Sequence, residues 1–399
     1  MKLSRLAVIG ATVSATAVLG ISTAAMATSG APAAPNHPAA APAAPVAPDS
    51  LRALAAKIDL RIGTAAGASR LTDPKLAPIT AGQFSTLTPE NDMKWQVVEP
   101  TQGQFDWTGA DNLVKFAQAN HQLVRGHTLV WHNQLPTWLT DGVTKGTITN
   151  AQLKDLLRQH IMTEVGRYKG KIWQWDVVNE VFSNTFDSTP PLPDGINSGD
   201  FWVSHLGEGI IADAFRWAHA ADPHALLCYN DFNIAGEDGT NLKFQNVFNF
   251  VKNLKAQGVP IDCVGEQGHL DTQFGFSGTR FQQDLAGYAS LGLKVAVTEA
   301  DVRTFVNNPT DQVPTNNNEV LAQPYEFGQM LKGCLAVRNC ISFTIWGFDD
   351  AESWVTGVFA GEGYADIYDV NLNKKDAYNE LQQDLRLAAF GAPDRPDTF

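Results

Sequence analysis

Two glutamates stand where a pair of carboxyl groups would face one substrate. Glu180 follows residues 177–179 at the end of one apolar run, and Glu299 ends another. Hydrolysis of a glycosidic bond needs such a pair, because one carboxylic acid protonates the leaving oxygen while a carboxylate attacks the anomeric carbon or activates water. A carboxyl separation of about 5–5.5 Å retains configuration, and one of about 6.5–9.5 Å inverts it. Taken alone, either glutamate has an alternative interpretation as a structural residue in an ion pair.

The elements that must position these glutamates are eight apolar runs of strand length, which alternate with amphipathic stretches of helical length. This alternation, without a second sheet pattern, predicts the α/β class and a single (β/α)8 TIM barrel. A doubly wound sheet is the alternative. It would show a glycine-rich phosphate loop after the first strand, and residues 62–67 match that pattern poorly. The strand-like runs are 60–64, 84–88, 123–131, 172–178, 225–229, 261–264, 293–298 and 341–346, and the clearest helical stretches are 151–168, 210–221, 244–257 and 374–389.

Nearly every strand-like run ends in a cluster of carboxylates, amides, imidazoles or indoles. In a TIM barrel the catalytic residues lie at the C-terminal ends of the strands, where eight loops converge. Glu180 ends the fourth run and Glu299 the seventh. These strands lie across the barrel mouth from each other, so the sequence predicts that both carboxyl groups reach one polar and aromatic groove.

The formal net charge of −13 disfavours nucleic acid and anionic membranes as partners, because binding to phosphate needs a basic face. Such a balance suits a protein that acts on something neutral. The ten tryptophans indicate a large core, or a groove that stacks flat rings such as sugars. His127, His132 and His269 suggest a metal site, but no HExxH or similar spacing is present. We therefore expect no metal and no cofactor, although Asp349 and Asp350 are conceivable calcium ligands.

The N-terminal segment has the pattern of a secretory signal peptide. Lys2 and Arg5 precede an apolar run over 6–21, and residues 25–27 read Ala-Met-Ala, which predicts residues 1–27 as the signal peptide with cleavage after Ala27. The alternative is a membrane anchor, but the run is short for a span of about 20 residues. Residues 28–50 are rich in Ala and Pro and predict a linker. We expect residues 51–399 to form the catalytic barrel of a secreted protein.

Export would place the four cysteines in an oxidising environment. Cys228 and Cys263 lie in consecutive strand-like runs, and Cys334 and Cys340 are close in sequence. The local pairing, Cys228–Cys263 with Cys334–Cys340, is one of three possible connectivities. Free buried thiols are the alternative.

Seven spaced motifs together resemble glycoside hydrolase family 10, the secreted endo-β-1,4-xylanases, over about residues 51–390. Four of them follow the second, fourth, fifth and seventh strand-like runs: Pro89-Glu90-Asn91-Asp92-Met93-Lys94-Trp95, Trp175-Asp176-Val177-Val178-Asn179-Glu180, Asn230-Asp231-x-Asn233 and Thr298-Glu299-x-Asp301. The others are Gly126–His132 followed by Gln134-Leu135-Pro136-x-Trp138, Gln267-x-His269, and Trp346-Gly347-x-x-Asp350-x-x-Ser353-Trp354.

This resemblance implies the barrel, a retaining double-displacement mechanism, Glu180 as acid/base and Glu299 as nucleophile. It implies that Asn179 contacts the sugar 2-hydroxyl, and that His269, oriented by Asp301, hydrogen-bonds Glu299. It also implies both cysteine pairings given above. The implied substrate-binding residues are Glu90, Asn91, Lys94, His127, Trp131, Gln134, Asn230, Phe232, Gln267, Trp346 and Trp354. Trp95 and Trp138 are expected with Trp131, Trp346 and Trp354 in the sugar-binding set, and Trp107, Trp173, Trp202 and Trp217 in the packing set.

The sequence departs from the family pattern at several positions. Phe232 stands where a tyrosine is usual, Glu266 and Gly268 flank Gln267, and Asp349 is atypical in the eighth loop. If the side chain of Glu266 points inward, its charge would raise the pKa of a neighbouring carboxyl. These departures affect the expected leaving-side affinity and pH optimum, and they leave the reaction class unchanged.

The sequence therefore predicts a secreted retaining endo-β-1,4-xylanase that acts on xylan and xylo-oligosaccharides. We expect a monomer without nucleic-acid or membrane partners and without a separate carbohydrate-binding module. One alternative is a β-1,4-glucanase with cellobiosidase-type activity. The other, from a different class, is a catalytically silent sugar-binding barrel.

Overall fold

The computed structural model describes residues 46–184, 189–236 and 242–390. The predicted signal peptide, most of the predicted linker and the last nine residues lie outside these ranges. Helix α1 (Leu51–Ala56) begins where the Ala/Pro-rich stretch ends, and the Ser50 side chain accepts a hydrogen bond from the N–H of Ala53. This hydrogen bond satisfies one of the free amide groups at the start of the helix.

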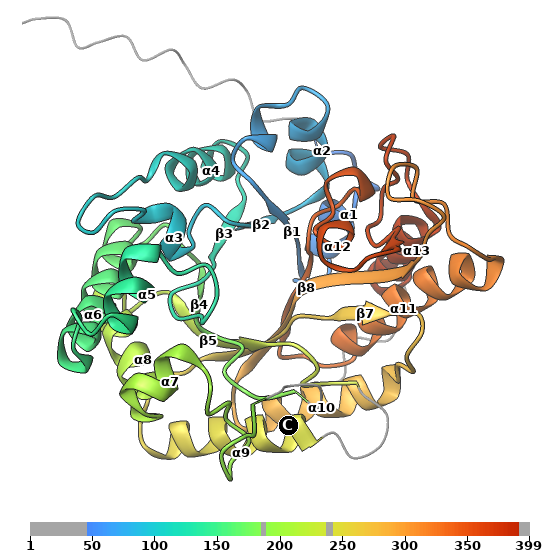
Figure 1. The fold of residues 1–399 in the computed structure, drawn as a ribbon. Coiled ribbons are helices and arrows are strands. Elements are labelled where there is room, and N and C mark those ends of the chain that lie inside the picture. Colours follow the sequence, from blue (N-terminus) through green and yellow to red (C-terminus); the bar gives the residue numbers. More distant parts are fainter. Residues whose placement is uncertain (1–45, 185–188, 237–241, 391–399) are drawn as a thin grey trace, which may run out of the picture. The chain divides into compact units, whose positions relative to one another are not determined.

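Eight parallel strands form a closed barrel, and the ring of strands is seen end-on in Figure 1. Each strand pairs with the next along the chain, apart from the intervening β7, and β9 closes the ring by pairing with both β8 and β1. The prediction of a (β/α)8 barrel is confirmed. The barrel strands are β1 (Arg61–Ala66), β2 (Thr86–Pro89), β3 (Leu123–Gly126), β4 (Gln174–Asn179), β5 (Leu226–Asp231), β6 (Cys263–Glu266), β8 (Lys294–Phe305) and β9 (Cys340–Ile345).

Two of the predicted strands differ from the observed ones by several residues in length, and the others by at most one. The third run was predicted over 123–131, but β3 ends at Gly126, and Val130 rejoins the sheet only through an isolated bridge to Val178. The seventh run continues well past 298, and the extension of β8 pairs with two short additional strands, β7 (His269–Asp271) and β10 (Glu362–Gly363). This extension lifts one wall of the barrel mouth above the strand ends.

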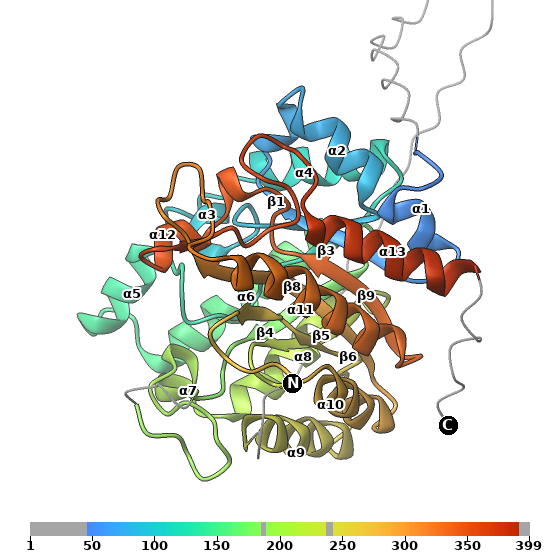
Figure 2. The same cartoon turned by 90° about the vertical axis from the view of Figure 1, so that its right-hand side faces the viewer.

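The helices surround the strand ring on its outside, as Figures 1 and 2 show from two directions. None of the helices in the described ranges is long and apolar enough to cross a membrane. The longer helices are α2 (Leu76–Gln83), α4 (Thr108–Ala119), α5 (Thr137–Thr144), α6 (Asn150–Arg167), α8 (Gly209–Ala221), α9 (Leu242–Ala256), α10 (Gly278–Ser290), α11 (Asn317–Leu335) and α13 (Asp376–Phe390), and the short ones are η1 (Arg70–Thr72), α3 (Trp95–Val98), α7 (Phe201–Leu206), η2 (Asp350–Glu352) and α12 (Val355–Val358).

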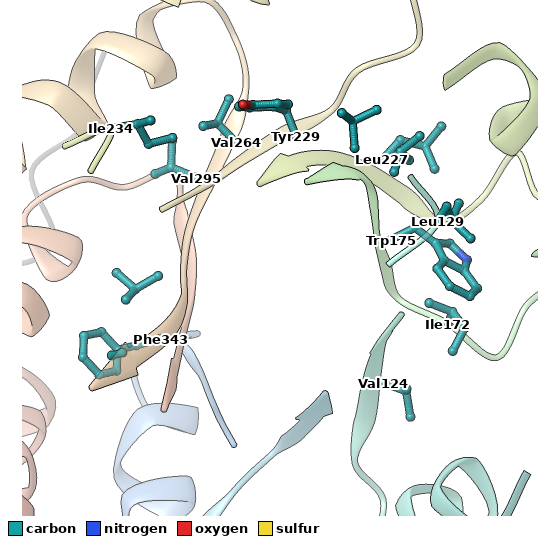
Figure 3. Close-up of a cluster of buried hydrophobic side chains, with 14 of the residues drawn as sticks. Val124, Leu129, Ile172, Trp175, Leu227, Tyr229, Ile234, Val264, Val295 and Phe343 are labelled. Atoms are coloured by element: carbon teal, nitrogen blue, oxygen red, sulfur yellow. The ribbon is translucent and has the colours of Figure 1, made fainter. Parts of the chain in front are cut away.

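The main core lies between the strands and the helix ring, where side chains such as Val124, Leu227 and Val264 are buried (Figure 3). Trp175 on β4 is fully buried, and it occupies the space that a side chain on Gly126 would need, because a Cβ there would collide with the indole ring. The glycine is thus required at the end of β3 for close approach of the tryptophan. Burial of such large side chains stabilises the barrel by about 1.5–3 kcal/mol each.

Both local disulfides are present. Cys228 and Cys263 are direct partners in the register of β5 and β6, and Cys334 near the end of α11 is bonded to Cys340 at the start of β9. Each disulfide constrains the unfolded chain, and a typical contribution is about 2–4 kcal/mol.

Candidate active site

A groove of about 1130 Å³ opens at the C-terminal ends of the barrel strands. It is lined by side chains on β8 and by side chains at or after the ends of β2, β3, β4, β5, β6 and β9, so the strand-end clusters do converge. Asn230, a predicted binding residue, and Asn179, expected to contact the sugar 2-hydroxyl, are absent from its lining, and both are buried. The predicted binding residues that line the groove are Glu90, Asn91, Lys94, His127, Trp131, Gln134, Phe232, Gln267, Trp346 and Trp354.

Glu299 lies on β8 with only 4% of its surface exposed. Its Oε1 accepts a hydrogen bond from Asn230 Nδ2 at 2.7 Å, and its Oε2 lies 3.3 Å from His269 Nε2. Burial alone would raise the pKa of the Glu299 carboxyl, but the hydrogen bond from His269 and the attraction of the His127 and His269 imidazoles hold this pKa below its usual value. Glu299 is therefore a buried carboxylate kept ionised at one wall of the groove.

His269 on β7 lies between two carboxylates. Its Nδ1 is 2.8 Å from Asp301 Oδ2, which also accepts a hydrogen bond of 2.7 Å from the indole N–H of Trp354. Burial alone would lower the pKa of His269, but Asp301 and Glu299 raise it to about 10. The imidazole is thus held as a cation against Glu299, and the same carboxylate fixes the orientation of Trp354.

Glu180 follows β4 directly, with a positive φ of 59°. Its Oε2 accepts a hydrogen bond of 2.6 Å from the indole N–H of Trp131, and its Oε1 accepts one of 2.8 Å from Gln267 Nε2. Both donors are neutral, and Glu180 itself is more exposed than Glu299. The carboxyl is thus fixed in orientation by donors that carry no charge.

Asn179 connects the two glutamates through amide groups. Its Oδ1 accepts from Asn230 Nδ2 at 2.8 Å and from Gln267 Nε2 at 3.3 Å. Its own Nδ2 is buried, and no group in the described ranges accepts a hydrogen bond from it. Asn230, which was predicted to bind substrate, instead positions Glu299 and Asn179 from below the groove.

The wall formed by the loops after β2 and β3 is polar. Asn91 Oδ1 accepts hydrogen bonds from Lys94 Nζ at 3.2 Å and from Gln134 Nε2 at 3.0 Å, and Lys94 Nζ lies 4.7 Å from the centre of the Trp131 ring. Burial lowers the pKa of Lys94, against the opposing effect of Glu299, Glu90 and Glu180. This wall offers a set of preordered donors and acceptors for sugar hydroxyls.

A buried charged network below this wall was not predicted. Asp176 on β4 forms an ion pair with Arg125 on β3, and its Oδ2 lies 3.0 Å from His127 Nδ1. Burial raises the pKa of Asp176, but Arg125 and His127 outweigh it and the pKa is lowered. Arg125 and Asp176 each lie within an apolar strand-like run, and a buried charge needs a partner. This pattern is the sequence signal that could have predicted the ion pair. The network holds the His127 ring at the groove.

The wall on the far side of the reacting centre is largely apolar and extends further than predicted. Phe232 lies under the ammonium group of Lys243, with Nζ 3.9 Å from the ring centre. The extension is formed by β7 and the segment after it, and by the end of α12. Sequence patterns do not distinguish such residues from ordinary surface. Its apolar members are Leu270, Phe274, Phe276, Val358 and Phe359.

Glu266 does not act in the way the sequence suggested. Its Oε2 accepts from the N–H of Ile234 at 2.8 Å and its Oε1 from the N–H of Gly268 at 3.1 Å, so both oxygens bind backbone amides. Burial raises the pKa of Glu266 itself to about 8. The groups that chiefly shift the pKa of Glu299 are His269, His127 and Asp176. Its contacts hold the loops that carry Phe232 and Gln267.

The expectation that Trp95 and Trp138 bind sugar is wrong. Trp95 and Trp138 belong to the packing set: Trp95 is 3% exposed and stacks between His160 and Trp202, with Trp138 at its edge. Both indole N–H groups donate to Glu99. Trp95 belongs to the buried core, Trp138 packs against it, and neither lines the groove.

Asp349, the atypical residue of the eighth loop, forms a buried ion pair with Arg70 in η1. The pair joins the loops after β1 and β9. In the described ranges, no group of three or more His, Cys, Asp or Glu side chains is placed to hold a metal ion.

The closed barrel brings two carboxyl groups to one groove, the arrangement that hydrolysis of a glycosidic bond needs. The profile of glycosyl hydrolase family 10 matches residues 50–384, and the chain belongs to this family. An endo-1,4-beta-xylanase of Agaricus bisporus is 37% identical over 321 residues, covering 80% of this chain and 89% of that protein. Endo-1,4-beta-xylanase B of Thermotoga neapolitana is 36% identical over 336 residues, covering 84% and 90%. Among solved structures, xylanase 10B from Thermotoga petrophila RKU-1 in complex with xylobiose superposes with a TM-score of 0.76 at 36% identity, covering 85% of this chain and 98% of that chain.

Proposed function

We propose that the protein is a secreted retaining endo-β-1,4-xylanase, which hydrolyses internal β-1,4-xylosidic bonds of xylan through a covalent glycosyl-enzyme intermediate. The observation that carries the proposal is the contrast between the two carboxyl groups of one groove. Glu299 is held ionised beside the cationic His269, and Glu180 is held by neutral donors. The similarity to enzymes named endo-1,4-beta-xylanases supports the choice of substrate.

In the first step, a carboxylate oxygen of Glu299 attacks the anomeric carbon and the bond to the leaving oxygen breaks. Glu180 gives its proton to that oxygen, so the shortened chain leaves as an alcohol. Asn230 and His269 fix the attacking carboxylate with hydrogen bonds to its two oxygens. No group among the described residues accepts a hydrogen bond from the buried Nδ2 of Asn179, and we propose that a sugar 2-hydroxyl does so, a contact that strengthens in the transition state.

In the second step, the ionised Glu180 takes a proton from water, and the water oxygen attacks the anomeric carbon of the glycosyl-enzyme. The bond to Glu299 breaks, Glu299 regains its negative charge, and Glu180 is protonated again. Two inversions at the same carbon give net retention of the β configuration. Trp131 and Gln267 keep the Glu180 carboxyl in place through both protonation states.

Selectivity for xylose over glucose is proposed to come from the indoles of Trp346 and Trp354. Trp354 is anchored by its hydrogen bond to Asp301, and both rings flank His269. A bulky wall at this place leaves little room for the C5 hydroxymethyl group of glucose. Steric discrimination of one small group is modest, about 1–3 kcal/mol.

Proton NMR of the first products from xylohexaose tests the mechanism, because the anomer formed before mutarotation reports the stereochemistry. We expect the β anomer first, from internal bonds of the chain. Initial formation of the α anomer would exclude the retaining mechanism. Faster release of reducing sugar from carboxymethyl cellulose than from xylan would favour the glucanase alternative, and xylo-oligosaccharide binding without turnover would favour the silent barrel.

Secretion is a separate part of the proposal, supported by the N-terminal pattern and by the two disulfides. We expect the full-length chain, expressed with an export pathway, to appear outside the cell with Thr28 as its first residue. Mass spectrometry of the N-terminal peptide of the exported protein measures this. An exported protein that retains Met1 would contradict cleavage after Ala27.

A further inference from the structure

The segment after β3 that carries Trp131 is held by two hydrogen bonds in series that begin on α7. The indole N–H of Trp202 on α7 donates to the backbone oxygen of Trp131 at 2.9 Å. The indole N–H of Trp131 donates in turn to Glu180 Oε2 at 2.6 Å. Trp202 is 1% exposed, and it is not among the described residues that line the groove. A buried side chain outside the groove is therefore connected to the carboxyl of Glu180 through one intermediate residue.

We propose that Trp202 is a positioning residue for Glu180. Its indole N–H fixes the backbone of Trp131, and Trp131 fixes the carboxyl that gives and takes the proton. This inference rests on the proposed function, and it adds a residue behind the groove wall on which the two proton transfers depend.

The first turn of α7 is itself fixed by a capping side chain. Asp200 Oδ1 accepts hydrogen bonds from the N–H groups of Trp202 at 2.9 Å and of Val203 at 3.0 Å. Its Oδ2 lies 3.5 Å from Nδ1 of His132, the residue after Trp131. Asp200 is 4% exposed, so these contacts are shielded from water. The start of α7 and the segment after β3 are thus joined at two adjacent positions.

Helix α7 and Glu180 belong to the same connection, because both follow β4. The N–H of Asn197, just before α7, donates to the backbone oxygen of Val181 at 2.9 Å. This hydrogen bond ties the chain that leads into α7 to the chain that leaves Glu180. Glu180, Trp202 and Trp131 therefore form a closed circuit of covalent chain and hydrogen bonds, and the circuit fixes their relative positions.

The ring of Trp202 is held in its orientation by a stack of rings. It lies parallel to the Trp95 ring, with 5.6 Å between the centres and 5° between the planes. Trp95 lies on His160 at 3.9 Å and 3°, and Phe201 meets the Trp202 ring nearly at a right angle, at 5.0 Å. A ring enclosed in this way in a close-packed interior has little room to turn. The direction of its N–H is therefore set by the fold, as the positioning of a reactive group requires.

Loss of the Trp202 N–H should disturb Glu180 and spare Glu299. The oxygens of Glu299 are held by Asn230 on β5 and by His269 on β7. A misplacement of about 1 Å can cost about 10²-fold in the rate of a step that needs the misplaced group. Steps that use the Glu180 proton should therefore slow, while attack by Glu299 should not.

Two aryl xylobiosides test the proposal with the full-length protein. The phenyl group needs a proton to leave, and the dinitrophenyl group does not. We expect Trp202→Phe to lower kcat/KM for the phenyl substrate by about tenfold or more, and for the dinitrophenyl substrate by less than about twofold. For the dinitrophenyl substrate, kcat and KM should fall together and a burst should appear, because the same carboxyl serves as the base in the second step.

Two further proteins separate the hydrogen bond from the packing. In the first, 3-benzothienylalanine replaces the tryptophan at position 202, so that sulfur stands in place of the N–H and the ring size is kept. It should show the same selective loss as Trp202→Phe. The second is the matched control Trp95→Phe, in the same stack, whose lost N–H donates to Glu99 at 2.8 Å. Any loss in this control should be equal for the two substrates. Both rates are measured on one sample, so a partly unfolded fraction cancels in their ratio.

The proposal is overturned if Trp202→Phe and the sulfur isostere lower kcat/KM for both substrates by the same factor or change neither. It is also overturned if Trp95→Phe gives the same selective loss, since packing would then explain the effect. Glu180→Ala, measured alongside, tests the proposed function itself. Equal losses on both substrates in Glu180→Ala would overturn the acid role of Glu180, whatever Trp202→Phe does.

Discussion

The surroundings of Glu299 and of Glu180 differ in charge, although the two carboxyl groups line the same groove. Glu299 is buried against an imidazolium that two carboxylates stabilise, and Asn230 donates to its other oxygen. Glu180 is more exposed and receives hydrogen bonds from an indole and an amide. A permanent nearby cation favours an anion that attacks, and the two neutral donors fix the orientation of the Glu180 carboxyl. The comparison therefore supports the different roles that we propose for two residues of the same type.

The largest expected effect on activity follows removal of the Glu299 carboxylate. We predict that Glu299→Ala lowers kcat/KM on xylan by about 10⁴-fold or more, because no covalent intermediate can form. Azide with an aryl xylobioside should restore turnover and give the α-glycosyl azide, since azide then attacks the substrate in place of Glu299. NMR of the product measures this, and a β-glycosyl azide would reverse the assignment.

Removal of the other carboxyl group should have a smaller effect that depends on the leaving group. We predict that Glu180→Ala lowers kcat on xylan by about 10²–10⁴-fold, because the leaving oxygen is no longer protonated. A dinitrophenyl xylobioside needs no protonation and should still form the intermediate in a burst. Azide should then give the β-glycosyl azide. Equal losses on xylan and on the dinitrophenyl substrate would contradict an acid role for Glu180.

The charge contrast itself is tested by His269→Asn. Loss of the imidazolium removes the attraction that lowers the pKa of Glu299, so protonation of the nucleophile should begin at higher pH. We predict that the acid limb of kcat/KM moves upward by about one to three pH units. Trp354→Phe, which removes a neutral donor to Asp301, is the matched control and should leave the limb in place. An unmoved acid limb in His269→Asn would show that the imidazole is not what ionises Glu299.

The smallest effect is on the free energy of unfolding, and the size of this effect should fall as the pH rises. The pKa of His269 is raised in the folded protein to about 10. The charged imidazole therefore contributes fully to the free energy of unfolding below about pH 6.5, and this contribution is lost as the pH rises through 10. We predict that His269→Asn lowers the free energy of unfolding by about 3 kcal/mol at pH 6, and by much less above pH 10. Denaturation with intact disulfides measures both values. A difference that is constant with pH would indicate lost packing only.

The site residues that the sequence predicted correctly are those whose positions follow from the order of the strands. A carboxyl at the end of the fourth run and another at the end of the seventh must meet at the mouth of a closed barrel, so Glu180 and Glu299 were predictable from topology. The same holds for Glu90, His127 and Trp346, which follow other strands and line the groove.

The parts that were not predicted depend on side-chain direction and on loop geometry. A tryptophan can stack on a sugar or on a histidine, and only the packing of α3 decides that Trp95 does the latter. Glu266 was expected to raise the pKa of a neighbouring carboxyl if its side chain pointed inward. Its oxygens instead accept hydrogen bonds from backbone amides of loops whose course is set by tertiary packing. The end of β3 at Gly126 and the extension of β8 also lie beyond what an apolar run specifies.

The central claim, that Glu299 is the nucleophile, is tested most directly by trapping the intermediate. A 2-deoxy-2-fluoro-xylobiosyl fluoride slows the second step more than it slows the first, so the glycosyl-enzyme accumulates. Mass spectrometry of peptic peptides should then find one fluoroxylobiosyl group, attached to Glu299, and inactivation should be slowed by xylobiose. A label on Glu180 or on another residue, or hydrolysis without any labelled protein, would contradict the account.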